Sequence, residues 1–139
     1  MSKRYEFIDH TADVGVKAYG DTLSDAFEMA ATAMFDIITD SSTIGEVGEY
    51  TIQLSADSLE ELLIDFLSEL LFLHDAYELL FGSFQIEIDE KKRVLNASIA
   101  GELFNDHKHK KGNEIKAVTY HLLEVHNINP FYVLVLFDL

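Results

Sequence analysis

The chain has 139 residues, no cysteine, and 25 Asp and Glu against 10 Lys and Arg, which gives a formal net charge of −15 at pH 7. This length predicts one domain, residues 1–139, that folds without a disulfide or structural zinc, and the lack of Cys excludes a thiol nucleophile. The acidic balance disfavours direct binding to nucleic acid or to an anionic membrane, and it favours cations or a protein with a basic face as partners.

No signal peptide is visible, because Met1-Ser2-Lys3-Arg4 leads at once into a strand-like segment. The most apolar run, residues 62–73, carries Asp65 and Glu69 and is too short to span a bilayer. We therefore expect a soluble, cytoplasmic protein without a membrane partner.

The first part of the chain predicts two strands followed by a helix. Residues 5–8 and 14–19 are strand-like, and the polar turn 9–13 separates them. From Leu23 to Ile38, apolar residues recur at spacings of three and four, which is the pattern of an amphipathic helix. Thr22 occupies the N-cap position of this helix.

The middle of the chain predicts a third strand and a second helix. Residues 50–54 alternate as a strand. The helix opens at Ser58, where Glu61 completes a capping box. Its apolar face predicts that it runs to about Leu80 before Gly82 and Ser83 end it.

The last part of the chain predicts two hairpins. Residues 84–88 and 94–103 form the first. Residues 115–125 mix helix and strand formers, and a strand is preferred because a hairpin with the apolar run 131–137 then closes the sheet. The predicted class is α+β, with two layers and a largely antiparallel sheet covered by two main helices.

Three acidic residues occupy positions where a metal site is possible. Asp13 lies in the first turn, Asp25 in the first turn of the first helix, and Asp138 directly after the last strand. If the fold brings them together, their mutual repulsion calls for a cation. Oxygen ligands suit a hard divalent ion, Ca²⁺ first, with Mg²⁺ or Mn²⁺ as alternatives. Leu139, through its carboxylate, and His10, beside the turn, are candidates to complete this shell.

Each of these acids also has a purely structural interpretation. Asp25 suits the positive end of a helix dipole, Asp13 is an ordinary turn residue, and Asp138 fits a solvated tail. With 25 acidic residues, a chosen triple arises easily by chance, and no EF-hand spacing supports it. The residues alone leave both interpretations open.

The basic residues include one candidate for a functional role. Lys116 follows the polar loop 105–113 and its basic cluster 107–111, at the point where the strand pattern resumes. It is either a surface lysine paired with one of many acids, or a positioned cation that meets the carboxylates, a phosphate or a partner. In the loop, His107 and His109 form a weak H-x-H motif and are expected to be exposed. Nucleophile-elbow and glycine-rich phosphate motifs do not occur.

Five segments in order along the chain carry a family resemblance. They are YEFIDHTADV at 5–14, AYGDTL at 18–23, AFE at 26–28 with AMF at 33–35, GNEIKAVTY at 112–120, and FDL at 137–139. Together they resemble the archease family over its whole length. The D-H-T-A-D block, the G-x-E-[IV]-K-A-[VI]-T-Y block and the acidic penultimate residue are specific in combination.

The resemblance implies an accessory protein of the RtcB-type RNA ligase, which joins a 3′-phosphate or 2′,3′-cyclic phosphate end to a 5′-hydroxyl with GTP and Mn²⁺ in tRNA splicing and RNA repair. It implies an activator and not an enzyme, one that promotes guanylylation of the ligase's active-site histidine and multiple turnover through a metal-bearing tip. The family's metal-binding acids fall on Asp13, Asp25 and Asp138, and its functional lysine falls on Lys116. No residue of this chain is then expected to be catalytic, and residues 107–111 receive no role.

Two other classes of function remain open at this point. The same carboxylates could activate water in an autonomous metal-dependent phosphoester hydrolase. The acidic surface alone is also typical of a general protein-binding or chaperone module, whose binding weakens with salt.

Overall fold

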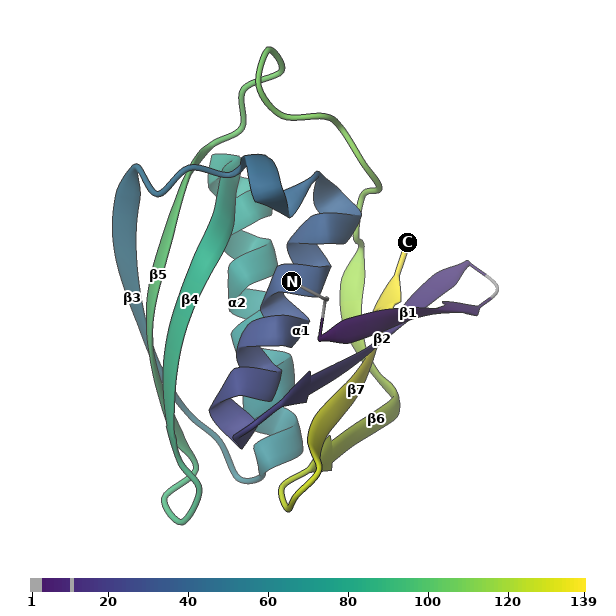
Figure 1. Cartoon of the computed structure of the whole chain (residues 1–139), viewed down its shortest axis with the longest axis vertical. Coiled ribbons are helices and arrows are strands. Elements are labelled where there is room, and N and C mark those ends of the chain that lie inside the picture. Colours follow the sequence, from purple (N-terminus) through teal and green to yellow (C-terminus); the bar gives the residue numbers. More distant parts are fainter. Residues whose placement is uncertain (1–3, 11) are drawn as a thin grey trace.

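The computed structural model describes residues 4–139 apart from Thr11 and the side chain of His10. Its elements, labelled in Figure 1, are β1 (Tyr5–His10), β2 (Asp13–Gly20), α1 (Leu23–Ile38), the short 3-10 helix η1 (Ser41–Thr43), β3 (Gly48–Ser55), α2 (Leu59–Tyr77), β4 (Leu79–Asp89), β5 (Val94–Leu103), β6 (Ala117–His126) and β7 (Phe131–Asp138).

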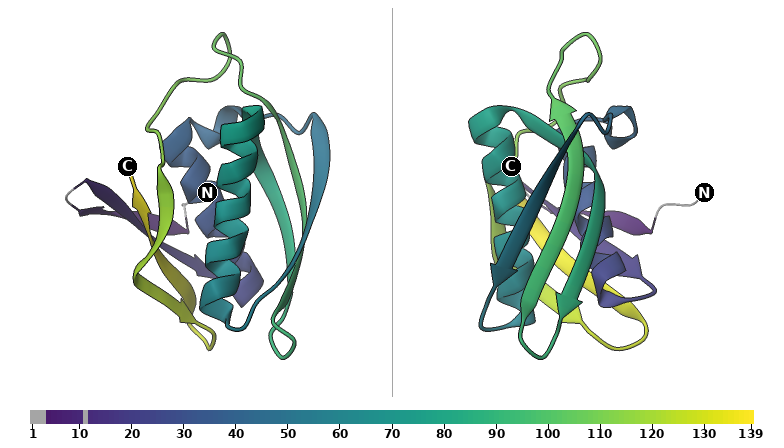
Figure 2. Two further views of the ribbon diagram at one scale, coloured as in Figure 1. Left: turned by 180° about the vertical axis from the view of Figure 1, so that it is seen from behind. Right: turned by 90° about the vertical axis from the view of Figure 1, so that its left-hand side faces the viewer.

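The strands form two antiparallel sheets, and the two helices lie between them (Figures 1 and 2). Sheet A has the strand order β1-β2-β7-β6, and sheet B has the order β3-β5-β4. The α+β class with two main helices and antiparallel strands is confirmed. The structure refines the expectation of one sheet, because β3, β4 and β5 form a sheet of their own on the far side of the helices.

Helix α1 packs against both sheets because its apolar surface is wide. Its buried residues include alanines and larger side chains on more than one face, so it packs on β2 on one side and on β4 on the other. The predicted N-cap is present, since the Thr22 hydroxyl accepts a hydrogen bond from the Asp25 amide at 3.1 Å. Phe27, Phe35 and Phe66 are fully buried between the layers. No helix in the described part of the chain is long and apolar enough to cross a membrane.

Helix α2 ends at Tyr77 and not near Leu80. Glu78 adopts a left-handed backbone with φ 57°, and its amide donates to the His74 carbonyl at 2.8 Å. Leu79 and Leu80 then belong to β4, where both are buried. An apolar pair suits a buried strand as well as a helix, so periodicity alone could not separate the two.

The ambiguous segment 115–125 is a strand, as preferred, and it carries a bulge. In the pairing of β6 with β7, Thr119 faces Leu136 while Glu124 faces Leu134, so four residues of β6 oppose one residue of β7. Leu122 lies in this bulge with φ 58° and is exposed. The mixed propensities of the segment correspond to this interruption of the ladder.

Candidate functional site

Asp13 and Asp138 lie opposite each other at one end of sheet A. Asp13 opens β2, Asp138 closes β7, and the two are register partners. On the outer strands of the sheet, His10 is the backbone partner of Asp13, and Ala117 is the partner of Asp138. Directly opposed residues of antiparallel strands share a face, with Cβ atoms about 4.5–5.5 Å apart. Two carboxylates from distant parts of the sequence therefore meet here, and we call them the acidic pair.

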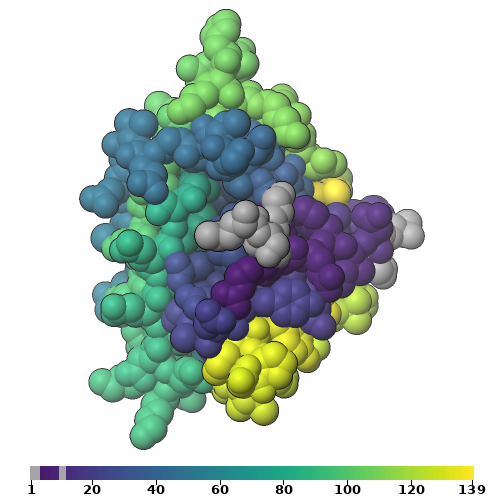
Figure 3. Space-filling model, in the orientation of Figure 1, coloured from purple at the N-terminus to yellow at the C-terminus, as the bar shows by residue number. Residues whose placement is uncertain are grey.

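Backbone hydrogen bonds tie the neighbouring segments to the acidic pair. The Lys116 amide donates to the Asp138 carbonyl at 2.7 Å, and the Leu139 amide donates to the Ala12 carbonyl at 3.2 Å. Ala12 has a left-handed backbone with φ 61°, which is unfavourable for a residue with a Cβ. The β1–β2 hairpin protrudes from the body of the molecule, and the last residues lie beside it (Figure 3).

The structure thus brings together four of the predicted residues. They are Asp13, Asp138, Lys116, whose side chain is exposed, and Leu139. The predicted role of the His10 side chain falls outside the described part of the structure.

Asp25 does not join this group. It lies beside Gly20, because a Cβ built on Gly20 would come within 2.6 Å of the Asp25 Cβ. Gly20 closes β2 seven positions after Asp13, which corresponds to about 23 Å along a strand. The structure therefore places Asp13 and Asp138 opposite each other and places Asp25 beside Gly20, at the other end of β2. Asp25 instead sits in the first turn of α1, where its charge favours the positive end of the helix dipole.

Asp36 of α1 lines a hollow that Asp13 also lines, and it was not among the acids singled out from the sequence. Together with Asp13 and Leu139 it lines a hollow of about 460 Å³ between the β1–β2 hairpin and the end of α1. The Tyr5 hydroxyl donates to its carboxylate, and the Ser41 amide donates to it at 2.8 Å. The sequence held one signal: Asp36 falls in the last turn of α1, where the helix dipole disfavours an acid.

The side-chain geometry of this site is incomplete as a metal cage. Among the described residues, no group of three or more His, Cys, Asp or Glu is arranged so that it could hold a metal ion. What the site offers is a pair of opposed carboxylates. Like charges directly opposite each other repel, and a cation would relieve that repulsion.

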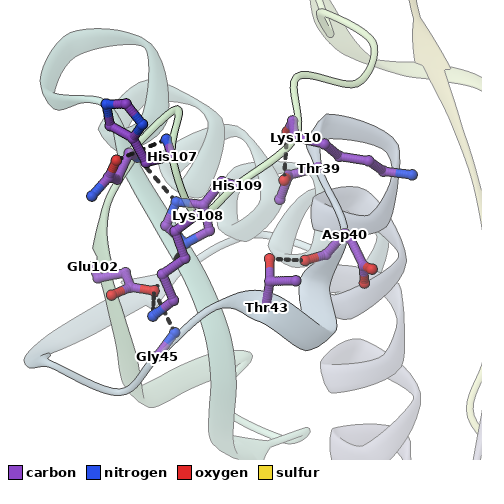
Figure 4. A network of polar contacts seen from close by, with 10 residues as sticks. Thr39, Asp40, Thr43, Gly45, Glu102, His107, Lys108, His109 and Lys110 are labelled. Atoms are coloured by element: carbon purple, nitrogen blue, oxygen red, sulfur yellow. Dashed lines mark hydrogen bonds and ion pairs between the residues drawn. The ribbon is translucent and has the colours of Figure 1, made fainter.

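A second polar network holds the loop that leads to Lys116 (Figure 4). The Glu102 carboxylate accepts hydrogen bonds from the Lys108 ammonium at 2.7 Å and the Gly45 amide at 2.6 Å. Lys108, the Gly45 amide and His109 all favour the ionised carboxylate, and against the opposing effect of burial they lower the pKa of Glu102 to about 2. The network fixes the beginning of the loop against β5.

His109 is part of this network and is buried, so the expectation that it is exposed was wrong. Its Nδ1 accepts from the Asn105 amide at 3.0 Å, and its Nε2 lies 2.9 Å from the Glu102 carboxylate. Because an amide nitrogen can only donate, Nε2 carries the proton and donates to Glu102. Both ring nitrogens are engaged, and His109 is therefore a structural residue of the loop. His107 is exposed, as expected.

The far end of the loop is fixed on the carboxyl end of α1. The Gly112 amide donates to the Ile38 carbonyl and the Asn113 amide to the Ile37 carbonyl, both at 2.8 Å. These bonds satisfy helix carbonyls that otherwise lack partners. A Cβ on Gly112 would lie 2.5 Å from the Ile37 oxygen, so glycine is required for this close approach. The contact fixes the direction in which the chain reaches Lys116.

Comparisons with known proteins agree with this architecture. The model of the Archease protein family (MTH1598/TM1083) matches residues 5–139. The chain belongs to the archease family. It is 41% identical over 128 residues to protein archease of Pyrococcus furiosus, covering 91% of this chain and 90% of that protein. It is 37% identical over 132 residues to protein archease of Sulfurisphaera tokodaii, covering 95% of each. The solution structure of Methanobacterium thermoautotrophicum protein 1598 matches with a TM-score of 0.86 and 38% identity, over 99% of this chain and 100% of that one.

In this archease-family chain, a second acid with a perturbed pKa, besides Glu102, lies away from the acidic pair. Glu28 of α1 is partly buried at the edge of β4, where the Ile86 backbone hydrogen-bonds its carboxylate. Burial, followed by the nearby charge of Asp25, raises the pKa of Glu28 to about 7, although the Ile86 bond opposes the shift. Glu28 lines a hollow of about 530 Å³ together with polar side chains of sheet B. It is therefore separate from the Asp13 and Asp138 site.

Proposed function

We propose that the chain is an activator of the RtcB-type RNA ligase in tRNA splicing and RNA repair, and that it acts on the ligase without catalysing a reaction of its own. Membership of the archease family over residues 5–139 carries the proposal. The pairing of Asp13 with Asp138 at an exposed tip, with Lys116 tied beside them, supports it.

The charge of the chain favours a protein partner over direct contact with RNA. A net charge of −15 repels phosphate, whereas a ligase that binds nucleotide, metal and RNA offers a basic face. In the proposal, that attraction draws the protruding β1–β2 hairpin and the adjoining chain end toward the nucleotide pocket of the ligase. We call the hairpin and the adjoining chain end the tip; the hairpin is one of the parts that project from the body of the molecule (Figure 3).

Asp13 and Asp138 fit a hard divalent cation as part of a ligand set. Ca²⁺, Mg²⁺ and Mn²⁺ take carboxylate oxygens, and we propose Ca²⁺ first. Since Ca²⁺ takes about six to eight oxygens, two carboxylates leave positions for Leu139, for water or for groups of the partner. We propose Asp36, and not Asp25, as the acid of α1 that supports this site, because Asp36 lines the same hollow as Asp13. When bound, the ion would neutralise the acidic pair and supply positive charge at the tip.

The residues of the chain act in this proposal by position and charge. Asp13 and Asp138 fix the tip in one geometry, because β2 and β7 are neighbouring strands. The backbone amide of Lys116 bonds the Asp138 carbonyl, and its exposed side chain can meet a phosphate or a carboxylate of the ligase pocket. Such a preorganised cation would favour the geometry in which the ligase histidine attacks the α-phosphate of GTP. Faster formation of the guanylylated ligase in each cycle then allows multiple turnover.

The test measures transfer of labelled GMP from GTP to the ligase, with and without this chain. We expect Asp138→Asn and Lys116→Ala to reduce the rate to that of the ligase alone while thermal unfolding stays close to wild type. Asp25→Asn is the matched control, an acid on the same molecule but at the other end of β2, and it should stimulate normally. Asp36→Asn should reduce stimulation.

Three results would contradict the proposal in different ways. Full stimulation by Asp138→Asn would remove the acidic pair from the mechanism. Loss of stimulation in Asp25→Asn, with Asp36→Asn unaffected, would refute the assignment of Asp36. Turnover of a phosphodiester by the isolated chain with Mn²⁺ or Mg²⁺ would indicate a hydrolase instead of an activator.

A further inference from the structure

An apolar groove lies on the sheet B side of the molecule, across the helices from the acidic pair. Its walls come from four elements and enclose about 410 Å³; they are Tyr50 of β3, Leu73 and Tyr77 of α2, Leu79 of β4 and Leu103 of β5. We call it the Tyr77 groove. Val47 lines a neighbouring hollow with Leu103, and the Phe72 ring packs edge-on against Tyr77 at 6.2 Å.

The exposed large apolar side chains of the protein are concentrated at this groove. In the described part of the chain, half of them lie here: Val47, Tyr50, Phe72, Tyr77 and Leu103. Single exposed apolar residues are ordinary, but a contiguous group of aromatic and aliphatic side chains marks an interaction surface. The folded chain itself does not cover the group.

The rim of the groove is acidic at the end of α2. Glu78 is exposed and lines the hollow that adjoins the groove at Leu103. The basic residue in the last turn of the helix is His74, whose Nδ1 lies 3.0 Å from the Leu79 carbonyl oxygen, and Asp75, also exposed, lies one position after it. The negative end of the α2 dipole lies at the same position, so it would stabilise a cation there and it destabilises the two carboxylates. Lys111 lines a hollow of about 300 Å³ with both carboxylates, but among the described residues it forms no ion pair with either.

Glu78 breaks a second local rule. Its left-handed backbone, with φ 57°, is the conformation in which helices usually end on Gly or Asn. A glutamate at this position costs stability through its backbone and again through its charge at the carboxyl end of a helix. Its carboxylate has no hydrogen bond or ion pair with any described residue that would offset these costs. A residue that breaks local rules without compensation within the fold is a candidate for recognition.

We propose that the Tyr77 groove docks a basic segment of the partner ligase, with an aliphatic or aromatic side chain in the groove and a Lys or Arg against Glu78. For the identity of the partner, this inference rests on the proposed function. A second copy of the chain is a poor occupant, because each copy carries a net charge of −15 and brings acids, not bases, to the rim.

The position of the groove separates its role from that of the tip. The acidic pair belongs to sheet A and the groove to sheet B and the end of α2, so a groove contact adds affinity without touching the reacting groups. Groove variants should therefore raise the concentration of the chain that gives half-maximal stimulation of the ligase. The maximal rate of guanylylation should stay unchanged.

The experiment titrates each variant into the ligase and measures both quantities. Leu103→Ser and Glu78→Lys are each expected to raise the half-maximal concentration by at least about tenfold, the size of an interface hot spot. Glu78→Gly is the sharper variant: it should raise the melting temperature, because glycine suits the left-handed backbone, and still weaken binding several-fold. Ile128→Ser is the matched control, since Ile128 is 65% exposed and Leu103 is 63% exposed.

The outcomes are distinguishable. If the wild-type chain stimulates the ligase and Leu103→Ser behaves like Ile128→Ser, the groove inference fails and the proposed function stands. If the wild-type chain neither binds nor stimulates the ligase, both fail. A dimer in sedimentation that Leu103→Ser dissociates would assign the groove to a second copy and would also overturn the inference.

Discussion

Glu28 gives a stability prediction whose sign and size follow from its surroundings. Its pKa rises from 4.5 in the unfolded chain to about 7 in the fold, because burial and Asp25 disfavour the charged form. Between these pH values the unfolded chain releases the proton and the folded chain retains it. The free energy of unfolding should therefore fall as pH rises from about 4.5 to 7, and it should stay lowered above that range.

The size of this loss follows from the pKa shift. A shift of this size corresponds to at most about 3.4 kcal/mol, at 1.36 kcal/mol per pKa unit. Glu28 is only partly buried, and solvent screening cuts this to roughly 1.5 kcal/mol. For a domain of this length that loss lowers the melting temperature by about 5 °C.

The variant that isolates the effect is Glu28→Gln. Glutamine keeps an oxygen that can accept the bond from the Ile86 backbone, but it cannot ionise. We expect its free energy of unfolding, from urea titrations at pH 4.5 to 8, to exceed that of wild type by about 1.5 kcal/mol at pH 8 and to equal it near pH 4.5. Asp25→Asn should shrink the pH-dependent loss, and Glu46→Gln, which removes an exposed loop acid, is the control. Parallel curves for wild type and Glu28→Gln would show that Glu28 does not retain the proton, and the argument would be wrong.

Three further predictions concern the loop and the acidic pair. Glu102→Gln should lower the free energy of unfolding by about 2 kcal/mol at pH 7, because it weakens the bonds to Lys108 and the Gly45 amide. The difference from wild type should vanish as pH falls through about 2, where the Glu102 carboxylate takes up its proton. Denaturant titrations at both pH values measure this difference, and equal stability at pH 7 would contradict the prediction. Gly112→Ala should lower the free energy of unfolding by about 2 kcal/mol, because the new Cβ would meet the Ile37 carbonyl oxygen. It should also speed hydrogen exchange of the amides of residues 112 and 113. Unchanged protection of these amides would show that the loop accommodates the Cβ. Ca²⁺ at 100 times its Kd should stabilise the wild-type chain by about 2.7 kcal/mol and leave Asp13→Asn unaffected; an equal shift in both would remove Asp13 from the site.

The boundaries that the sequence predicted well are those set by local chemistry. Thr22 begins α1 because its hydroxyl satisfies a free amide of the first turn, and Ser58 does the same for α2. Such signals involve only a few consecutive residues and are visible in the sequence. The end of α2 was missed because Glu78 provides the left-handed residue where glycine is expected, so no familiar stop signal was present.

The candidate site was predictable only in part, because its members meet through tertiary register. Local chemistry distinguishes Asp25 from Asp36 only through the helix dipole, which favours an acid in the first turn of α1 and disfavours one in the last turn. Which of them approaches Asp13 depends on the direction in which α1 runs past β2, and the sequence does not state it. His109 was misjudged for the same reason, since the Glu102 carboxylate and the Asn105 amide that bury it are brought there by the fold of the loop.

The two helices share a feature that links the tip and the groove. Each ends in acids: Asp36 lies in the last turn of α1, and Asp75 and Glu78 lie at the end of α2, where the dipole calls for cations. The loop between β5 and β6 touches both ends, through the Gly112 amide on Ile38 and the Phe104 amide on the Glu78 carbonyl. Of its lysines, Lys108 pairs with Glu102, and Lys111 lines a hollow with Asp75 and Glu78. The acids at the two helix ends destabilise the isolated chain, and binding of a cationic partner or of a metal ion would offset that cost. The acids at the carboxyl ends of α1 and α2 therefore lower the stability of the isolated chain, and the same acids would make these helix ends selective for a positively charged partner.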